Sequence, residues 1–298
     1  MAITRRKYPS KILLFGEYGV LMGLDALAVP YFPFYGKLSL KPAGDSSVWN
    51  GFLAHLQSLE GVLPFVFKFS QLEKDIKRGL WFNSNIPYNY GLGSSGALVA
   101  AVFDSYFTVK GRNTKVDLRA LKTSLALMES YFHGRSSGID PLVSLIQNPV
   151  LVQKSGRVVL PEERILPSRR KLQLFLVDSQ VPGKTGDLVT QFMDKINDLE
   201  FASTFRQAYQ KHSNGAIQHL LHKRIEAFME SFRNLSTFQY ENMKELIPPT
   251  VSPLFERGLS SGLYALKICG SGGGGYFLGV TKYKESVEDQ LGLPVHFI

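Results

Sequence analysis

Residues 90–101 read YGLGSSGALVAA, and more of the fold depends on this stretch than on any other. Gly91, Gly93 and Gly96 have the spacing G-x-G-x-x-G, which occurs in dinucleotide-binding turns and in other loops that wrap a phosphate at the start of a helix. Apolar residues at helical spacing follow over 98–107. We therefore predict a glycine turn that leads into a buried helix.

Three interpretations of this turn are open. A dinucleotide site needs a strand that runs into the first glycine, but the preceding SNIPYNY (84–90) indicates a loop, although Asp117 stands at about the distance where such sites place an acidic residue. A phosphate site would use the glycine backbone, with Ser94 and Ser95 in the first helical turn. The plain alternative is a serine N-cap after a glycine turn.

A second glycine-bearing segment is DSQVPGKTGD, residues 178–187. It ends like a P-loop, but Asp178 occupies the position of the first P-loop glycine, and Pro182 removes one backbone N–H. A carboxylate there would repel phosphate, so we exclude a P-loop. Lys184 and Thr185 remain candidates to face a substrate.

A third segment is KICGSGGGGYFLGV, residues 267–280. Its four consecutive glycines, Gly272–Gly275, stand between apolar stretches that read as strands. A flexible linker would be polar on both sides, so this run predicts a close approach of the backbone to another group. A purely structural corner between two strands is the alternative.

The length of 298 residues predicts two domains. We place the boundary in the polar loop that carries Pro161 and Pro167, which gives domains of 1–167 and 168–298. The first mixes strands and helices, and the second reads as α+β. Strands are expected at 11–15, 172–177, 263–269 and 276–280, and helices at 118–132, 188–196, 205–232 (interrupted at Asn214-Gly215) and 243–247.

Composition narrows the functional classes. The formal net charge of +9 is dispersed, without the basic stripe of a nucleic-acid-binding face. No apolar run reaches the ~18–20 residues that cross a bilayer. The one cysteine, Cys269, is typical of a reducing compartment. We therefore expect a cytoplasmic protein whose partners are small molecules, not nucleic acid or membrane.

Three segments together resemble a known family. KILLFGEYGVLMGLDALAVP (11–30), IPYNYGLGSSGALVA (86–100) and KICGSGGGGYF (267–277) are similar, in order and spacing, to the three motifs of the GHMP kinases (galacto-, homoserine, mevalonate and phosphomevalonate kinases). The resemblance implies an α+β, two-domain GHMP kinase fold, with an N-terminal domain like ribosomal protein S5 domain 2 and a ferredoxin-like C-terminal domain. It also implies ATP and Mg²⁺ as cofactors, and a homodimer.

Two further segments resemble mevalonate kinases within this family. HGRSSGIDPLVS (133–144) is similar to the segment that carries their catalytic aspartate, and VDSQVPGKTGDLV (177–189) to one with a threonine that faces substrate. The implied reaction is phosphorylation of the 5-hydroxyl of mevalonate by ATP. Tyr18 after Glu17 is more usual in phosphomevalonate kinases, so that enzyme, another GHMP kinase such as a sugar kinase, and a non-catalytic nucleotide or sugar sensor stay as alternatives.

The resemblance also assigns roles to particular residues. Asp140 would accept or orient the proton of the substrate hydroxyl, and Lys11 would offset charge on the aspartate and on the γ-phosphate. Ser95 and Glu129 would hold Mg²⁺. The residues expected at the nucleotide are Pro87, Gly91, Leu92, Gly93, Ser94, Ser95 and Gly96. Those expected at the substrate are Glu17, Tyr18, Lys184, Thr185, Gly272, Gly273 and Gly274.

Overall fold

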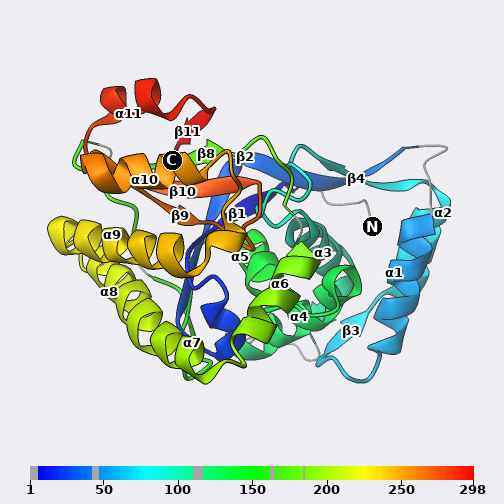
Figure 1. Cartoon of the computed structure of the whole chain (residues 1–298). Helices are drawn as coiled ribbons and strands as arrows, with labels where there is room; N and C mark the ends of the chain where they lie inside the picture. The colour runs from blue at the N-terminus through cyan, green and yellow to red at the C-terminus, as the bar shows by residue number, and fades with distance from the viewer. Residues whose placement is uncertain (1–5, 42–46, 110–116, 162–164, 169, 184) are drawn as a thin grey trace.

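A computed structural model describes residues 6–41, 47–109, 117–161, 165–168, 170–183 and 185–298. Most of its strands form two main sheets, one built from the first half of the chain and one from the second (Figure 1). The strands before residue 160 are β1 Tyr8–Phe15, β2 Ala26–Leu40, β3 Phe65–Phe67, β4 Leu80–Ser84, β5 Phe107–Val109, β6 Val150–Val152 and β7 Val158–Val159. Those after it are β8 Gln173–Asp178, β9 Tyr264–Ile268, β10 Tyr276–Thr281 and β11 Val295–Phe297.

The N-terminal sheet is built around the long strand β2. The first half of β2 pairs with β1 on one side and β6 on the other, its second half pairs with β4, and β7 joins the far edge of β6, all antiparallel. All eight residues of β1, YPSKILLF, are buried, which is why an almost continuous apolar run replaces the alternation of a half-exposed strand. The predicted strand at 11–15 is confirmed, with three more residues at its start.

Helices of the first half cover this sheet. α3 and α5 pack directly on β1 and β2, and α4 packs against both of these helices. α1 and α2 lie to one side, beside the small sheet of β3 and β5 (Figure 1). The bounds are η1 Gly19–Met22, α1 Ser47–Ser58, α2 Phe69–Lys77, α3 Ser94–Tyr106, α4 Leu118–His133 and α5 Ile139–Ile146. Both predicted helices, the one after the glycine turn and the one at 118–132, are confirmed.

The C-terminal sheet has the order β11-β8-β10-β9, and every pairing is antiparallel. One group of helices separates β8 from β9, and α11 separates β10 from β11, so the chain follows the β-α-β-β-α-β path of a ferredoxin-like domain. The ferredoxin-like prediction is confirmed. The helices are α6 Thr185–Lys195, α7 Leu199–Thr204, η2 Phe205–Tyr209, α8 Gln210–Leu221, α9 Ile225–Asn242, η3 Lys244–Leu246, α10 Ser252–Ser261 and α11 Lys284–Leu291.

The predicted break at Asn214-Gly215 is wrong. α8 runs through both residues, and the chain turns at 222–224 instead, between α8 and α9. Gly215 lies where α8 meets α9, because a Cβ there would stand 3.0 Å from Ser231 Oγ. The glycine therefore permits the two helices to pack closely, whereas the prediction interpreted it as a turn residue.

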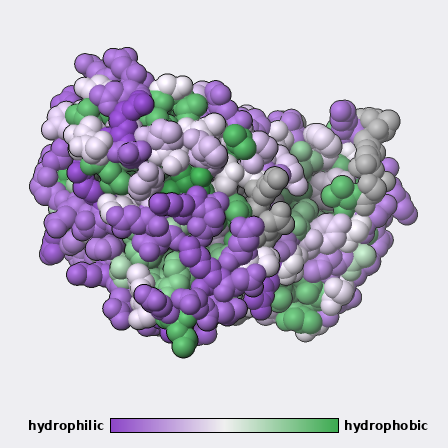
Figure 2. Space-filling view, viewed as in Figure 1, coloured by the Kyte–Doolittle hydropathy of each residue, from purple (hydrophilic) through white to green (hydrophobic). Residues whose placement is uncertain are grey.

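The surface gives no continuous apolar face in the view shown. Figure 2 shows polar residues over much of this side, with apolar residues in separate patches. Within the part of the chain that the structure describes, no helix is long and apolar enough to span a membrane. The proposed boundary between domains 1–167 and 168–298, and the homodimer, stay predictions.

Candidate active site

The glycine turn of 91–96 lies between the two main sheets. The Leu92 carbonyl accepts a hydrogen bond from the Lys11 backbone N–H at 3.0 Å, which ties the turn to β1. A Cβ on Gly91 would stand 2.9 Å from the Cys269 carbonyl oxygen, so only glycine lets this loop approach the end of β9. The Leu92 side chain is buried in the core, so the contact with nucleotide, which stays a prediction, would fall to its backbone.

The start of α3 presents unpaired donors. Gly93 is the N-cap with a left-handed backbone (φ 73°), and no side chain caps the helix. A serine N-cap, the plain alternative, is thus ruled out. The backbone N–H groups of residues 94–96 form the first turn of α3 directly after this N-cap. Helix N-termini of this kind favour anions. Pro87 is half-buried in the loop that leads to the turn.

The dinucleotide alternative lacks two of its parts. β4 ends at Ser84, and a loop over 85–93 separates it from α3, so no strand runs into Gly91. Asp117 is the N-cap of α4, where its carboxylate accepts hydrogen bonds from the N–H groups of Arg119 and Ala120. That aspartate therefore starts a helix and is not available for a ribose.

Lys11 and Asp140 form an ion pair beside the glycine turn, with Lys11 Nζ 3.2 Å from Asp140 Oδ2. Lys11 is almost fully buried, whereas the Asp140 side chain is 27% exposed. Burial alone would lower the pKa of Lys11, but attraction to Asp140 and other neighbours outweighs it, so the pKa is raised. Lys11 therefore stays a cation over the whole physiological range.

Two glycines of the turn make room for this pair. A Cβ on Gly93 would lie 3.0 Å from Asp140 Oδ2 and 3.1 Å from Lys11 Cγ. A Cβ on Gly96 would lie 2.7 Å from Asp140 Cβ, because the start of α5 packs onto the start of α3. Gly96 is buried and admits the aspartate, and its contact with nucleotide stays a prediction.

Ser95 and Glu129 meet next to this pair. Ser95 Oγ donates to Glu129 Oε1 at 2.9 Å, across from α3 to α4. Glu129 is only 4% exposed; burial, and then the nearby charge of Asp140, raise its pKa to about 7. Hydroxyl and carboxylate oxygens suit Mg²⁺, which takes one or two protein ligands and completes its shell with phosphate oxygens and waters. The pair fits that ion. Among the described residues, no group of three or more His, Cys, Asp and Glu side chains could hold a metal unaided.

Sequence reasoning missed two neighbours of the pair formed by Ser95 and Glu129. His133 Nε2 lies 3.0 Å from Ser95 Oγ, and Ser136 Oγ donates to Glu129 Oε2. Burial lowers the pKa of His133, against the attraction of Asp140. His133 lies four residues after Glu129 on α4, so the helical i, i+4 spacing was a usable signal for it. The sequence carried no comparable signal for Ser136.

Glu17, predicted to contact substrate, has a different role. Its carboxylate is fully buried in an ion pair with Lys267 Nζ from β9, and the Tyr209 hydroxyl donates to its backbone carbonyl at 2.6 Å. Burial raises the pKa of Glu17, against the attraction of Lys267. The side chain therefore links the two halves of the chain and reaches no open site.

Tyr18, the other substrate candidate in this segment, is also buried. Its hydroxyl donates to the Ser271 carbonyl at 2.5 Å, and its ring packs 4.4 Å from that of Phe192. Tyr18 thus fixes the loop before the glycine run. Lys184 lies outside the described residues; α6 begins at Thr185, whose side chain is likewise not described.

The glycine run packs against three other loops. Gly273 N–H donates to the Leu246 carbonyl at 2.7 Å, and Gly275 N–H donates to the Val181 carbonyl at 2.6 Å. A Cβ on Gly275 would meet the Tyr90 backbone at 2.7 Å. Gly272 and Gly274 are buried in the same junction. The backbone of these glycines thus closes the wall between the loops, and their contact with substrate stays a prediction.

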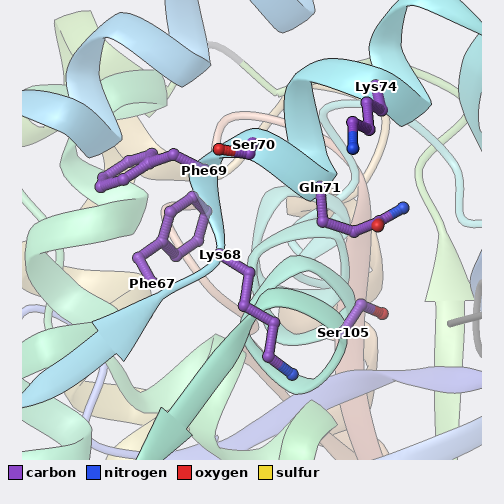
Figure 3. A pocket seen from close by; sticks show the side chains of 7 residues that line it. All are labelled: Phe67, Lys68, Phe69, Ser70, Gln71, Lys74 and Ser105. Carbon is purple, nitrogen blue, oxygen red and sulfur yellow. The ribbon is translucent and has the colours of Figure 1, made fainter.

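A separate pocket of about 420 Å³ lies elsewhere in the first half of the chain (Figure 3). Its lining comes from the end of β3, the residue after it, α2 and the end of α3: Phe67, Lys68, Phe69, Ser70, Gln71, Lys74 and Ser105. Ser105 follows Ser95 by ten residues of α3, which is about 15 Å along the helix axis. The pocket is therefore not part of the site of Lys11 and Asp140.

Comparisons with known proteins show similar sequences and folds. Residues 60–147 match the model of the GHMP kinases N terminal domain. A mevalonate kinase of Archaeoglobus fulgidus is 25% identical over 285 residues, which cover 92% of this chain and 91% of that protein. The Streptococcus pneumoniae phosphomevalonate kinase in complex with phosphomevalonate and AMPPNP aligns with a TM-score of 0.67 at 15% identity, over 98% of this chain and 99% of that one. The L. major mevalonate kinase in complex with R-mevalonate aligns with a TM-score of 0.61 at 17% identity, over 96% and 90%.

The fold and the site thus point to one class: the chain has the fold of the GHMP kinases, and residues 60–147 are similar to the N-terminal domain of these enzymes. The two solved structures share its fold, and the curated relative it resembles along nearly its whole length is a mevalonate kinase.

Proposed function

We propose that the chain is a mevalonate kinase that transfers the γ-phosphate of ATP to the 5-hydroxyl of mevalonate. The contact between Lys11 and Asp140, at the open start of α3, is the observation that carries this proposal. It puts a proton acceptor and a fixed cation beside a ready anion site, as phosphoryl transfer requires. The similarity to a curated mevalonate kinase along most of the chain supports the choice of acceptor.

Each residue then has a defined task in the transfer. The first turn of α3 would bind the phosphates through its backbone N–H groups. The acceptor hydroxyl oxygen would form its bond to the γ-phosphorus as the bond to the ADP oxygen breaks, and the hydroxyl proton would pass to the Asp140 carboxylate. Lys11, buried and cationic, would stabilise the charge that spreads over the transferring phosphoryl group.

Ser95 and Glu129 are the residues that would hold Mg²⁺. When bound, the ion neutralises charge on the β- and γ-phosphates. Their position beside the anion site supports this role, with Glu129 buried and Ser95 half-buried, and so does the chemistry of the donor set, which is all oxygen.

The test of the acceptor is an ADP-release assay with mevalonate, phosphomevalonate, galactose and homoserine offered separately. We expect turnover with mevalonate alone. Selective turnover of phosphomevalonate would replace the proposal with the second candidate, which Tyr18 after Glu17 favours. ATP binding without turnover of any acceptor would indicate a sensor.

The test of the mechanism is Asp140→Asn, which keeps the size of the side chain and removes the proton acceptor. Turnover should fall by about 10²–10⁴-fold while ATP still binds. Asp289→Asn, at an exposed position of α11, is the matched control and should leave turnover unchanged. Near-normal rates in the Asp140 variant would refute the assigned role.

A further inference from the structure

The turn between α4 and α5 connects two carboxylates of the candidate site. Glu129 lies near the end of α4, and Asp140 lies in the first turn of α5. The five residues 134–138 between the helices therefore set the distance between the metal ligand and the proton acceptor. Ser136, in the middle of this turn, makes a hydrogen bond on each side.

On one side Ser136 Oγ donates to Glu129 Oε2. On the other it accepts from the Gly138 N–H at 2.9 Å. Gly138 is the N-cap of α5, two residues before Asp140, and it has the left-handed backbone (φ 73°) that glycine favours. One hydroxyl thus joins the carboxylate of α4 to the cap of α5.

The two oxygens of Glu129 have different partners, and this fixes the carboxylate. Oε1 accepts from Ser95 and Oε2 accepts from Ser136, so rotation about the last side-chain bond would break both hydrogen bonds. A glutamate side chain otherwise has several rotamers, and fixing one costs entropy when the metal binds. With Ser136 in place, Oε1 is turned toward Ser95 before any ligand arrives.

The neighbouring Ser137 provides an internal comparison. Its Oγ accepts from the Ile139 N–H at 3.3 Å, a local turn bond like that of Ser136. Its backbone carbonyl accepts from Lys122 Nζ at 2.9 Å, a bond that any side chain at 137 preserves. No hydrogen bond between Ser137 and Glu129 occurs in the described part of the chain. The two serines therefore differ in the hydrogen bond to Glu129, which Ser136 makes.

We propose that Ser136 is a positioning residue for the metal site: it orients Glu129 so that Ser95 and Glu129 bind the Mg²⁺ of Mg·ATP. The proposal rests on the proposed function in one respect, that Glu129 is a metal ligand. It does not depend on which alcohol accepts the phosphate.

The experiment measures metal binding directly, with Mn²⁺ as a paramagnetic probe. Free Mn²⁺ is followed by electron paramagnetic resonance in the presence of protein and ADP, for the wild type, Ser136→Ala, Ser136→Thr and Ser137→Ala. Calorimetry with ADP and a chelator gives the metal-free affinity. Ser136→Ala should weaken Mn²⁺ binding in the ternary complex about tenfold, because loss of a group that orients a metal ligand typically costs about 10–100-fold in metal affinity. The metal-free ADP affinity should stay within about twofold.

The other two variants decide between positioning and general loosening of the turn. Ser136→Thr retains the hydroxyl and should restore most of the Mn²⁺ affinity, and Ser137→Ala should match the wild type. In kinetic assays with the accepted alcohol, Ser136→Ala should raise the apparent KM for Mg²⁺ and leave kcat at saturating Mg²⁺ within a few-fold.

Three results would overturn the proposal. They are unchanged Mn²⁺ affinity in Ser136→Ala, an equal loss in Ser137→Ala, and no Mn²⁺·ADP complex in the wild type. The acceptor assay tests a different claim. A protein that binds Mn²⁺·ADP as expected but does not phosphorylate mevalonate would refute the proposed acceptor and leave the role of Ser136 unchanged.

Discussion

Glu129→Gln should make the protein more stable at neutral and alkaline pH, although it removes a proposed metal ligand. Glu129 is buried near Asp140, and these surroundings raise its pKa to about 7. In the unfolded chain the same carboxyl ionises near its ordinary pKa of 4.5. Folding must therefore hold a proton on Glu129 or bury its charge at any pH above that value.

The sign and the size follow from this difference. A raised carboxyl pKa contributes stability that is fully present below about pH 4.5 and is lost as the pH rises toward about 7. A shift of this size corresponds to up to about 3 kcal/mol at 1.36 kcal/mol per unit. Glutamine does not titrate, so the variant avoids this loss. It also keeps an oxygen to accept from Ser95 and an N–H₂ to donate to Ser136.

The assay is guanidinium unfolding between about pH 5 and pH 9, without nucleotide or divalent cations. The gain in unfolding free energy of Glu129→Gln over the wild type should grow by about 2–3 kcal/mol from pH 5 to pH 8. Glu288→Gln, at an exposed position of α11, is the control and should show no such trend. A pH-independent difference, or a variant less stable than the wild type at pH 8, would refute the reasoning.

Two further predictions concern the packing around the site. Lys267→Met leaves the Glu17 carboxylate buried without its cation, so the unfolding free energy should fall by about 3–5 kcal/mol in denaturant titrations. Adding Glu17→Gln to this variant should recover part of the lost stability. A loss below about 1 kcal/mol in Lys267→Met would contradict a buried ion pair. Gly96→Ala places a Cβ 2.7 Å from that of Asp140 and should displace α5, with about 1–3 kcal/mol lost in thermal unfolding and at least a tenfold drop in ADP release. Normal turnover in that variant would show that α5 tolerates the shift.

Much of the fold could be predicted from local sequence. The buried strand at β1, the helix after the glycine turn and the strands on both sides of Gly272–Gly275 follow from apolar periodicity and turn residues, which act over a few positions. The error at Gly215 has the same origin. A glycine in a helix and a glycine in a turn look alike until the partner helix is known.

The site was less accessible to sequence reading, because its contacts join distant positions. Lys11 and Asp140 were named through family motifs, and the structure brings them together. Glu17 lies in one of the same motifs, yet it faces Lys267, some 250 residues away in the chain. No pattern near Glu17 indicates that partner. Motifs thus identified the residues, and only the tertiary fold distinguished those that face the site from those that support it.

The junction between the glycine-bearing loops has a consequence for how the protein is made. The loop at 88–91 obtains its final contacts from Cys269 and Gly275, which leave the ribosome long after the rest of the first sheet. At about 5–20 residues per second, synthesis of the intervening chain takes roughly 10–40 s. During that interval the nascent first half lacks these contacts for the loop at 88–91. A chain released early would therefore carry this loop without its partners from the C-terminal half, so the loop reaches its final packing only near the end of translation.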